Sequence, residues 1–241
     1  MSKIYEALKK AEQDRERTRV RAPERPLPRG DGAERPDPTQ EEYQKLRASL
    51  ISLSVPSGLH TILVTAARHG EGTTTVALGL ANALAREKDA RVLLVEANLR
   101  RPALSALLSL TSASGLVDFA SGRAAAEAIA TRLEEFNISV VPAGSAVGVQ
   151  INFDLVEALL GRLRPQYDFI IVDAPPVNSY ADASMLATKV DGVILVVEAD
   201  RTPIVEAETA KRQLDKVGAR ILGVVLNRRR SYIPAFLESI L

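Results

Sequence analysis

The sequence predicts an α/β protein, with a doubly wound, mainly parallel β-sheet flanked by helices in three layers. Short apolar runs rich in β-branched residues recur along the chain without polar alternation, which is typical of strands buried on both faces. Helical patterns separate these runs, so strand and helix alternate as in β-α-β units. A chain of 241 residues is long enough for one such domain with additional segments.

Composition argues against several other classes of protein. The chain has 31 basic and 30 acidic residues, so its charge gives no reason to expect a nucleic-acid partner. It has no cysteine and two histidines, which removes thiolate chemistry and argues against a multi-histidine metal site. No apolar run approaches the ~18–20 residues that cross a bilayer, and the charged start "MSKIYEALKK" is unlike a signal peptide. We therefore expect a soluble, cytoplasmic protein.

The first part of the chain differs in composition from the rest. Residues 1–18 place Ile4 and Leu8 on one face of a short amphipathic helix. Residues 19–38 are rich in proline and arginine, which predicts a disordered or polyproline-like linker. An alternative for "APERPLP" is a peptide that docks in an aromatic groove. The predicted third part, residues 39–241, is the α/β domain.

The elements of this domain follow in order. A helix starts near Thr39, a suitable N-cap, and Tyr43, Leu46 and Leu50 follow at a spacing of three to four residues. Six buried strands are expected at 61–67, 91–97, 138–144, 169–175, 192–199 and 220–227. Helices are expected between them at 74–87, 101–109, 124–135, 153–164, 180–189 and 203–217.

The octapeptide "RHGEGTTT" connects the first of these strands to a helix, which is the context of a phosphate-binding loop. Gly70 and Gly72 would let the backbone turn its N–H groups toward a phosphate, and the helix N-terminus adds positive potential. Thr74 stands at the position from which a side-chain hydroxyl would reach Mg²⁺. The expected nucleotide-binding residues of the loop are Arg68, Gly70, Glu71, Gly72, Thr73, Thr74 and Thr75.

The loop lacks the lysine of a P-loop, because Thr73 stands where the pattern G-x-x-x-x-G-K-[ST] requires it. That lysine contacts the β and γ phosphates. Its loss should weaken nucleotide binding, and weaken phosphoryl transfer still more. Arg68 could supply a substitute guanidinium; the alternative is a solvated loop residue.

Two further strands end in polar side chains that face the same edge of the predicted sheet. Glu96 and Asn98 follow one strand, and Asp173 ends another. Ligands bind at the carboxyl ends of parallel strands in such sheets. Asp173 could hold a magnesium-bound water and would form the metal site together with Thr74. The alternative for Asp173 is a buried or capping role.

Eight stretches together resemble a known family. They are "EEYQKLRASL", "VTAARHGEGTTTVALGLANALA", "VLLVEANLRRP", "GLVDFASG", "ISVVPAG", "YDFIIVDAPPV", "YADASMLATKVDGVILVVEA" and "ARILGVVLNR". Residues 41–230 resemble the cytoplasmic domain of bacterial protein-tyrosine kinases (BY-kinases) of capsular and exopolysaccharide biosynthesis, relatives of the deviant P-loop ATPases. The resemblance implies a P-loop NTPase-like fold that binds ATP and Mg²⁺, autophosphorylation of a tyrosine-rich C-terminal tail, and a membrane-embedded chain-length regulator as partner.

The sequence departs from this family where the chemistry should be. The P-loop lysine is Thr73, and the expected Asp-x-Asp after the second strand is Glu96 and Asn98. Asp173 and the hydroxyl of Thr74 remain. The resemblance thus implies Asp173, Glu96 and Asn98 as the catalytic candidates, in a site that looks degenerate.

Other family features are partly kept. The tail "SYIPAFLESIL" has one tyrosine, Tyr232, as the possible phospho-acceptor, and its hydrophobic pattern resembles a packed or partner-binding helix. The oligomer-forming Glu-x-x-Arg-x-x-Arg motif keeps Glu41 and Arg47 as expected interface residues, but has Gln44 in its middle. Asn227 would face adenine by the same resemblance.

Three hypotheses follow. The first is a degenerate kinase that regulates or scaffolds the polysaccharide export and chain-length complex, cytoplasmic and held at the inner membrane through a partner, with ATP or ADP and Mg²⁺ bound if binding is retained. The second is a working tyrosine autokinase in which Arg68, or a lysine or arginine of a neighbouring subunit in a homo-oligomer, replaces the missing charge. Arg100 and Arg101 are candidates for this intersubunit contact; the alternative for both is a solvated or carboxylate-paired role. The third is a localisation ATPase that a terminal helix attaches to a membrane or partner.

Overall fold

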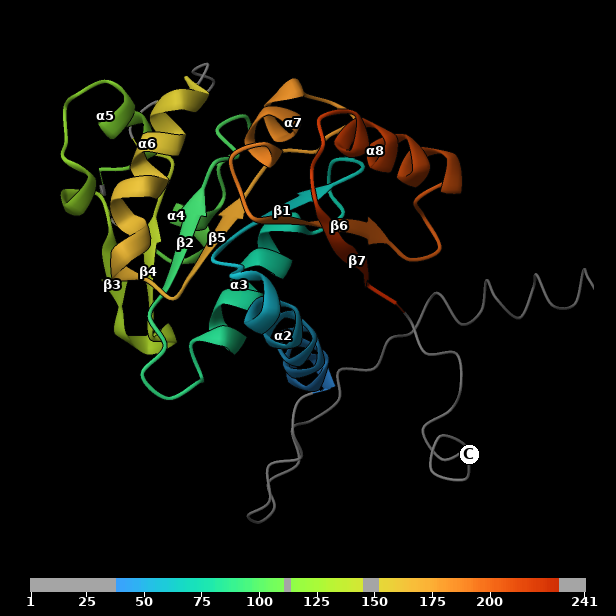
Figure 1. The fold of residues 1–241 in the computed structure, drawn as a ribbon, viewed down its shortest axis with the longest axis horizontal. Coiled ribbons are helices and arrows are strands. Elements are labelled where there is room, and N and C mark those ends of the chain that lie inside the picture. Colours follow the sequence, from blue (N-terminus) through green and yellow to red (C-terminus); the bar gives the residue numbers. More distant parts are fainter. Residues whose placement is uncertain (1–37, 111–113, 145–151, 230–241) are drawn as a thin grey trace, which may run out of the picture. The chain divides into compact units, whose positions relative to one another are not determined.

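The computed structural model describes residues 38–110, 114–144 and 152–229, and these form a seven-stranded sheet covered by helices on both faces (Figure 1). The doubly wound α/β fold predicted from the sequence is confirmed. The helix expected at 1–18, and nearly all of the linker expected at 19–38, lie outside the described residues.

The strands lie in the order β3-β4-β2-β5-β1-β6-β7. All neighbouring pairs are parallel except β3 and β4. Their bounds are β1 Thr61–Ala66, β2 Val92–Glu96, β3 Thr131–Leu133, β4 Ile138–Val141, β5 Phe169–Asp173, β6 Gly192–Glu198 and β7 Ile221–Asn227. Because β1 lies between β5 and β6, the loop that leaves β1 meets the ends of both neighbours.

Two hydrophobic clusters, one on each face of the sheet, form the core. On one face α2 and α3 pack, and on the other α5, α6, α7 and α8 (Figure 1). The helices are α2 Pro38–Ser57, α3 Thr73–Leu84, α4 Leu104–Leu107, α5 Leu116–Ala120, α6 Phe153–Leu163, α7 Ala181–Ala187 and α8 Ile204–Lys216. Short 3₁₀ turns lie at Ala126–Ala128, Glu134–Phe136 and Arg164–Gln166. Within the described parts of the chain, no helix is both long enough and apolar enough to cross a membrane.

Close packing at one glycine joins α2 to the helix that follows the loop. A Cβ on Gly79 of α3 would collide with the ring of Tyr43. The Tyr43 hydroxyl donates a 3.3 Å hydrogen bond to the backbone oxygen of Thr75 in the first turn of α3. The helix predicted from Thr39 therefore supports the start of α3, where the loop that leaves β1 ends.

The helix predicted at 124–135 is wrong. This segment forms one 3₁₀ turn and then β3, which pairs antiparallel with β4. Ala126 and Ile129 are fully buried, and Asn137 turns the chain with a φ of 53°. The helix propensity of Ala and Glu amounts to only tenths of a kcal/mol per residue, so burial and strand pairing outweigh it. The helix predicted at 101–109 is reduced to the four residues of α4.

Candidate functional site

The loop between β1 and α3 is shaped by two glycines in the left-handed region. Gly70 has a φ of 85° and Gly72 a φ of 90°, conformations that L side chains rarely adopt. The carbonyl of Gly72 accepts the first bond of α3, from the Val76 amide at 2.9 Å. The first amides of a helix have no partner within it, so the start of α3 offers donors to an anion.

Asn227 braces the loop from the end of β7. Its Nδ2 donates a 2.7 Å hydrogen bond to the backbone oxygen of Glu71. A Cβ on Gly72 would collide with the same nitrogen, so the amide closely approaches the bare glycine. The adenine contact expected for Asn227 stays a prediction. In the structure, its amide holds the loop.

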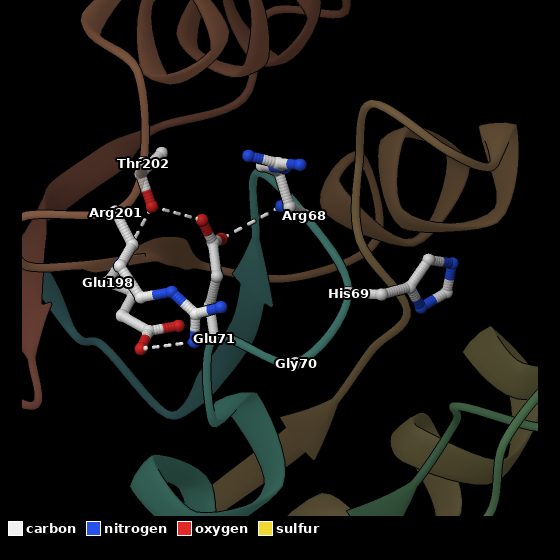
Figure 2. A pocket seen from close by; sticks show the side chains of 7 residues that line it. All are labelled: Arg68, His69, Gly70, Glu71, Glu198, Arg201 and Thr202. Atoms are coloured by element: carbon white, nitrogen blue, oxygen red, sulfur yellow. Dashed lines mark hydrogen bonds and ion pairs between the residues drawn. The ribbon is translucent and has the colours of Figure 1, made fainter.

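The carboxylate of Glu71 is turned into the protein and is 2 % exposed as a residue. One oxygen accepts a hydrogen bond from the Thr202 hydroxyl, and the other accepts from the Arg68 amide at 2.8 Å (Figure 2). The Thr202 oxygen in turn accepts from the Glu198 amide at 2.9 Å. These bonds hold the Glu71 carboxylate within the protein, and its nucleotide-binding role stays a prediction. The sequence did not reveal Thr202, although "EADRTP" follows a strand end.

Arg68 points away from the glycines of the loop. Its side chain leaves the loop on the side opposite to Gly70 (Figure 2). Its Nε lies 3.0 Å from a carboxylate oxygen of Glu206 on α8, and both side chains are about half exposed. The guanidinium that could replace the P-loop lysine is therefore engaged elsewhere.

Thr74 and Asp173 come together at the centre of the site. The Thr74 hydroxyl donates a 2.7 Å hydrogen bond to Oδ2 of Asp173. The pKa of the Asp173 carboxyl is raised to about 7, mainly by burial; the hydrogen bond from Thr74 opposes this rise, and the nearby Glu96 adds to it more weakly. Oδ1 of Asp173 is buried without a hydrogen-bond partner among the described residues. A carboxylate and a hydroxyl are ligands that suit Mg²⁺, and the free oxygen fits a cation or its bound water.

Thr73 occupies the lysine position and is 9 % exposed. Its hydroxyl ends two bonds from the backbone, so it lacks both the reach and the charge of a lysine. The loop therefore fits a nucleotide's phosphates through its backbone and its magnesium through Thr74 and Asp173, but without a cation at the lysine position.

Glu96 and Asn98 both bind backbone amides within the protein. The fully buried Glu96 carboxylate accepts from the amides of Ala103, Leu104 and Ala143, which ties α4 and the end of β4 to β2. Asn98 Oδ1 accepts from the Arg101 amide at 3.3 Å. These bonds give both side chains structural tasks, and their catalytic role stays a prediction.

A cluster beside the loop was not predicted from the sequence. His69 meets the ring of Tyr180 edge-on, with centroids 5.4 Å apart. The Arg100 guanidinium lies 5.0 Å from the centre of the same ring and pairs with Asp182 at 3.1 Å. In the sequence, only the position of "NLRRP" just after a strand end could have indicated this cluster. Arg100 is thereby held within its own chain, although it was a candidate for an intersubunit contact.

The residues expected at an oligomer interface lie on α2. Glu41 is exposed, while Arg47 pairs with Glu87 of the same chain at 2.8 Å. Tyr232 lies outside the described residues. The interface and the phospho-acceptor therefore remain predictions.

Comparison with known proteins agrees with this geometry. The family model described as ParA, "NUBPL iron-transfer P-loop NTPase", matches residues 59–237. Tyrosine-protein kinase CpsD of Streptococcus pneumoniae serotype 4 is 33 % identical over 196 residues, which are 78 % of this chain and 84 % of CpsD. The kinase domain of VpsO is 30 % identical with a TM-score of 0.68, over 79 % of this chain and 98 % of that domain.

A third protein bears on the ligand. MinD of Pyrococcus horikoshii, a septum site-determining protein solved as a complex with Mg-ADP, is 25 % identical with a TM-score of 0.59. The alignment covers 75 % of this chain and 76 % of that one. This MinD thus binds a magnesium nucleotide, the kind of ligand for which the loop, Thr74 and Asp173 are suited.

Proposed function

Since the chain belongs to the ParA-type P-loop NTPase family, as a relative of its tyrosine-protein kinases, we propose that it is a degenerate tyrosine kinase that works by binding partners. It would keep a weak site for a magnesium nucleotide and would regulate or scaffold a polysaccharide-assembly complex. Iron transfer, named in the description of the family model, has no support in a chain without cysteine, the usual ligand of iron–sulfur clusters.

One observation carries the proposal. The position that should bear lysine holds the buried Thr73, and the nearest substitute, Arg68, is paired with Glu206 at 3.0 Å. Phosphoryl transfer depends on positioning and on cationic stabilisation of charge on the transferred group. A loop without that cation keeps the shape of the site but loses most of its effect on the transition state.

The remaining residues support binding better than catalysis. The loop amides and the start of α3 would hold the phosphates, and Thr74 with Asp173 would hold Mg²⁺. When bound, Mg²⁺ supplies charge neutralisation between phosphate oxygens. Asp173 with its pKa near 7 is partly protonated at neutral pH, and must give up that proton before it can hold the ion.

The partner is proposed from the resemblance. Relatives of this chain are tyrosine-protein kinases. The bacterial tyrosine kinases that the sequence resembles work with a membrane-embedded chain-length regulator. We propose that the chain is cytoplasmic and reaches the inner membrane through such a regulator. Homo-oligomerisation through α2 belongs to the same proposal.

Calorimetric titration with Mg·ADP and Mg·ATP, followed by a phosphotransfer assay, tests the proposal. The wild type should bind weakly, and Thr73→Lys should tighten binding of Mg·ATP at least about tenfold, equal to about 1.4 kcal/mol. Thr188→Lys is the matched control, because it adds the same charge at an exposed threonine that ends α7. Three residues later the Asp191 amide bonds to Thr61 at the start of β1, whereas the loop follows the end of that strand. Thr188→Lys should leave the affinity nearly unchanged.

Two results would contradict the proposal. One is tight Mg·ATP binding by the wild type together with tyrosine phosphorylation that Asp173→Ala abolishes, which would indicate a working autokinase. The other is tightening of equal size in Thr188→Lys, which would show that added positive charge acts without the geometry of the loop.

A further inference from the structure

The loop between β1 and α3 is held through one of its residues by the ends of two neighbouring strands. The carboxylate of Glu71 accepts a hydrogen bond from the hydroxyl of Thr202, in the turn between β6 and α8 (Figure 2). The backbone oxygen of Glu71 accepts a 2.7 Å hydrogen bond from Nδ2 of Asn227, the last residue of β7. Glu71 therefore links the loop to segments that lie 131 and 156 residues later in the chain.

Hydrogen bonds, and not apolar packing, support the loop on the side of β6. A cavity of about 260 Å³ lies there, bordered by the loop and by the turn that follows β6. The described residues that line it are all charged, polar or glycine. They are Arg68, His69, Gly70, Glu71, Glu198, Arg201 and Thr202 (Figure 2). Because these residues form no hydrophobic contact across the cavity, the shape of the loop here depends on the bonds of Glu71.

The Thr202 hydroxyl is fixed by the turn in which it lies. Its oxygen accepts a 2.9 Å hydrogen bond from the Glu198 amide at the end of β6. In return, the Thr202 amide donates to the Glu198 backbone oxygen at 3.0 Å. A hydroxyl has a single hydrogen to donate, and that of Thr202 goes to Glu71. The end of β6 thus sets where the Glu71 carboxylate lies.

The same carboxylate closes the loop on itself. Its second oxygen accepts a 2.8 Å hydrogen bond from the Arg68 amide, which encloses Gly70 with its φ of 85°. The Arg68 amide is thereby engaged. The amides of residues 69–75, in contrast, donate no hydrogen bond to any described residue. Consecutive free amides in a tight loop form a concave site for an anion.

Asn227 adds to this arrangement from β7. A trans peptide unit is planar, so its C=O and N–H groups point in opposite directions. The unit that joins Glu71 to Gly72 has its oxygen bound by Asn227. Its N–H, on Gly72, therefore points away from Asn227 and stays available to an anion.

We propose that Thr202 is a positioning residue of the phosphate-binding loop. It fixes the Glu71 carboxylate, and Glu71 in turn keeps the loop in the conformation that leaves the amides of residues 69–75 free for phosphate oxygens. Thr202 acts through Glu71 and does not itself contact the nucleotide. The inference rests on the proposed nucleotide site, to which it adds a residue from the turn between β6 and α8.

The affinity of the full-length chain for Mg·ADP tests the proposal. Thr202→Val removes the hydroxyl but keeps the size of the side chain. It should lower the affinity at least about tenfold, because small displacements of positioning groups have large effects. The comparison is made in the wild type and in the Thr73→Lys chain, whose tighter binding keeps such a fall measurable. Thr202→Ser retains the hydroxyl and should restore the affinity to within about threefold.

Thr209→Val is the matched control. The Thr209 hydroxyl donates a 2.7 Å hydrogen bond to the Val205 backbone oxygen within α8, and binds nothing in the loop. Its loss should leave the affinity for Mg·ADP unchanged. Unfolding free energies of all variants, measured in parallel, identify any general loss of stability.

Two further measurements separate positioning from direct contact with the nucleotide. Glu71→Ala should weaken binding as much as Thr202→Val does, and the double variant should be no weaker than Glu71→Ala alone, because both changes break the same link. Hydrogen exchange of the Arg68 amide, followed by NMR without nucleotide, should be at least about tenfold faster in Thr202→Val. That exchange reports on the link whether or not the wild type binds nucleotide.

Several results would overturn the inference. They are an equal loss of affinity in Thr209→Val, a loss that Thr202→Ser does not restore, a further fall in the double variant, and unchanged exchange of the Arg68 amide. Absence of Mg·ADP binding in both the wild type and Thr73→Lys would overturn it together with the proposed function. Tight binding and tyrosine phosphorylation by the wild type would overturn the proposed function alone, as long as Thr202→Val still weakens binding.

Discussion

The Thr74 hydroxyl donates a 2.7 Å hydrogen bond to one oxygen of the fully buried Asp173 carboxyl, whose other oxygen has no partner among the described residues. When the carboxyl is ionised, its two acceptor oxygens thus share a single hydrogen-bond donor among the described residues. Such a group favours either a proton or a bound cation. We therefore expect a pH dependence of stability, and the proposed binding of Mg²⁺, to depend on the same pair.

Asp173→Asn should remove a pH-dependent loss of stability. The folded pKa of about 7 is raised above the unfolded value of 3.8, so the wild type is favoured at low pH and loses this contribution as pH rises through 7. The stability of Asp173→Asn relative to wild type should increase by about 2–3 kcal/mol from pH 5 to pH 8. Urea unfolding of both proteins at the two pH values measures it.

Glu135→Gln, at an exposed site, is the control for this comparison and should follow the wild type at both pH values. Parallel pH profiles for Asp173→Asn and wild type would mean that Asp173 is ionised in the folded protein well below neutral pH.

Glu96→Gln should destabilise the fold. The carboxylate accepts from three backbone amides, and an amide side chain would set an N–H group against at least one of them. A buried donor left without an acceptor costs about 1–3 kcal/mol, which corresponds to a melting temperature lower by roughly 3–10 °C. Calorimetry measures the shift, again against Glu135→Gln. An unchanged melting temperature would leave Glu96 free for the catalytic role that the sequence suggested.

The sequence predicted the parts of the fold that depend on local patterns. Five strands, β1, β2, β4, β5 and β6, are buried almost throughout, so their apolar runs were recognisable, and the loop between β1 and α3 followed from its glycines. The run of β7 was also recognised as a strand, but the expectation that it is buried was wrong, because Val224 and Leu226 are exposed. The strand at Thr131–Leu133 was missed because its pairing with β4 is a tertiary effect that its helix-forming composition conceals. A local pattern does not carry that information.

The directions in which the side chains of the site point were harder to predict, because they also depend on tertiary contacts. From the sequence we expected Glu71 to bind nucleotide, but in the structure its carboxylate accepts a hydrogen bond from Thr202, 131 positions later in the chain. Arg68 looked available until Glu206 of α8 paired with it. Glu96 binds an amide 47 residues away. Positions of strand ends could be predicted from sequence, whereas the competition among their side chains depends on distant segments.

Gly72→Ala should be destabilising for two separable reasons. An alanine at a φ of 90° is strained, and its Cβ would collide with the Asn227 amide. Gly70→Ala is a matched control, because its φ is 85° but a Cβ there would meet nothing within 4 Å. Backbone strain alone costs about 1–3 kcal/mol, so Gly72→Ala should cost more than Gly70→Ala.

The double variant Gly72→Ala/Asn227→Ala isolates the collision. Removing the amide relieves the clash but not the strain, so the double variant should be about 1 kcal/mol more stable than the sum of the single effects. Unfolding free energies of the four proteins give this coupling. Simple additivity would mean that the Asn227 side chain swings away from the loop at little cost.

Glu206→Gln tests whether Arg68 can be recovered for nucleotide binding. In the wild type the Arg68 guanidinium pairs with Glu206 on the outer side of the loop, and both side chains are about half exposed. Because an exposed ion pair contributes little free energy, this pair is weak and easily broken. Neutralising Glu206 frees Arg68 to turn toward the phosphates, and we expect affinity for Mg·ADP to rise about two- to fivefold. Arg68→Ala in that background should abolish the gain, while Glu208→Gln, on an exposed position of the same helix, should not produce it.

If Arg68→Ala alone weakens binding tenfold, the arginine already contacts nucleotide in the wild type, because loss of a surface ion pair with Glu206 cannot explain so large an effect. In that case the missing lysine is compensated within the chain, and a working kinase becomes the better explanation of the site.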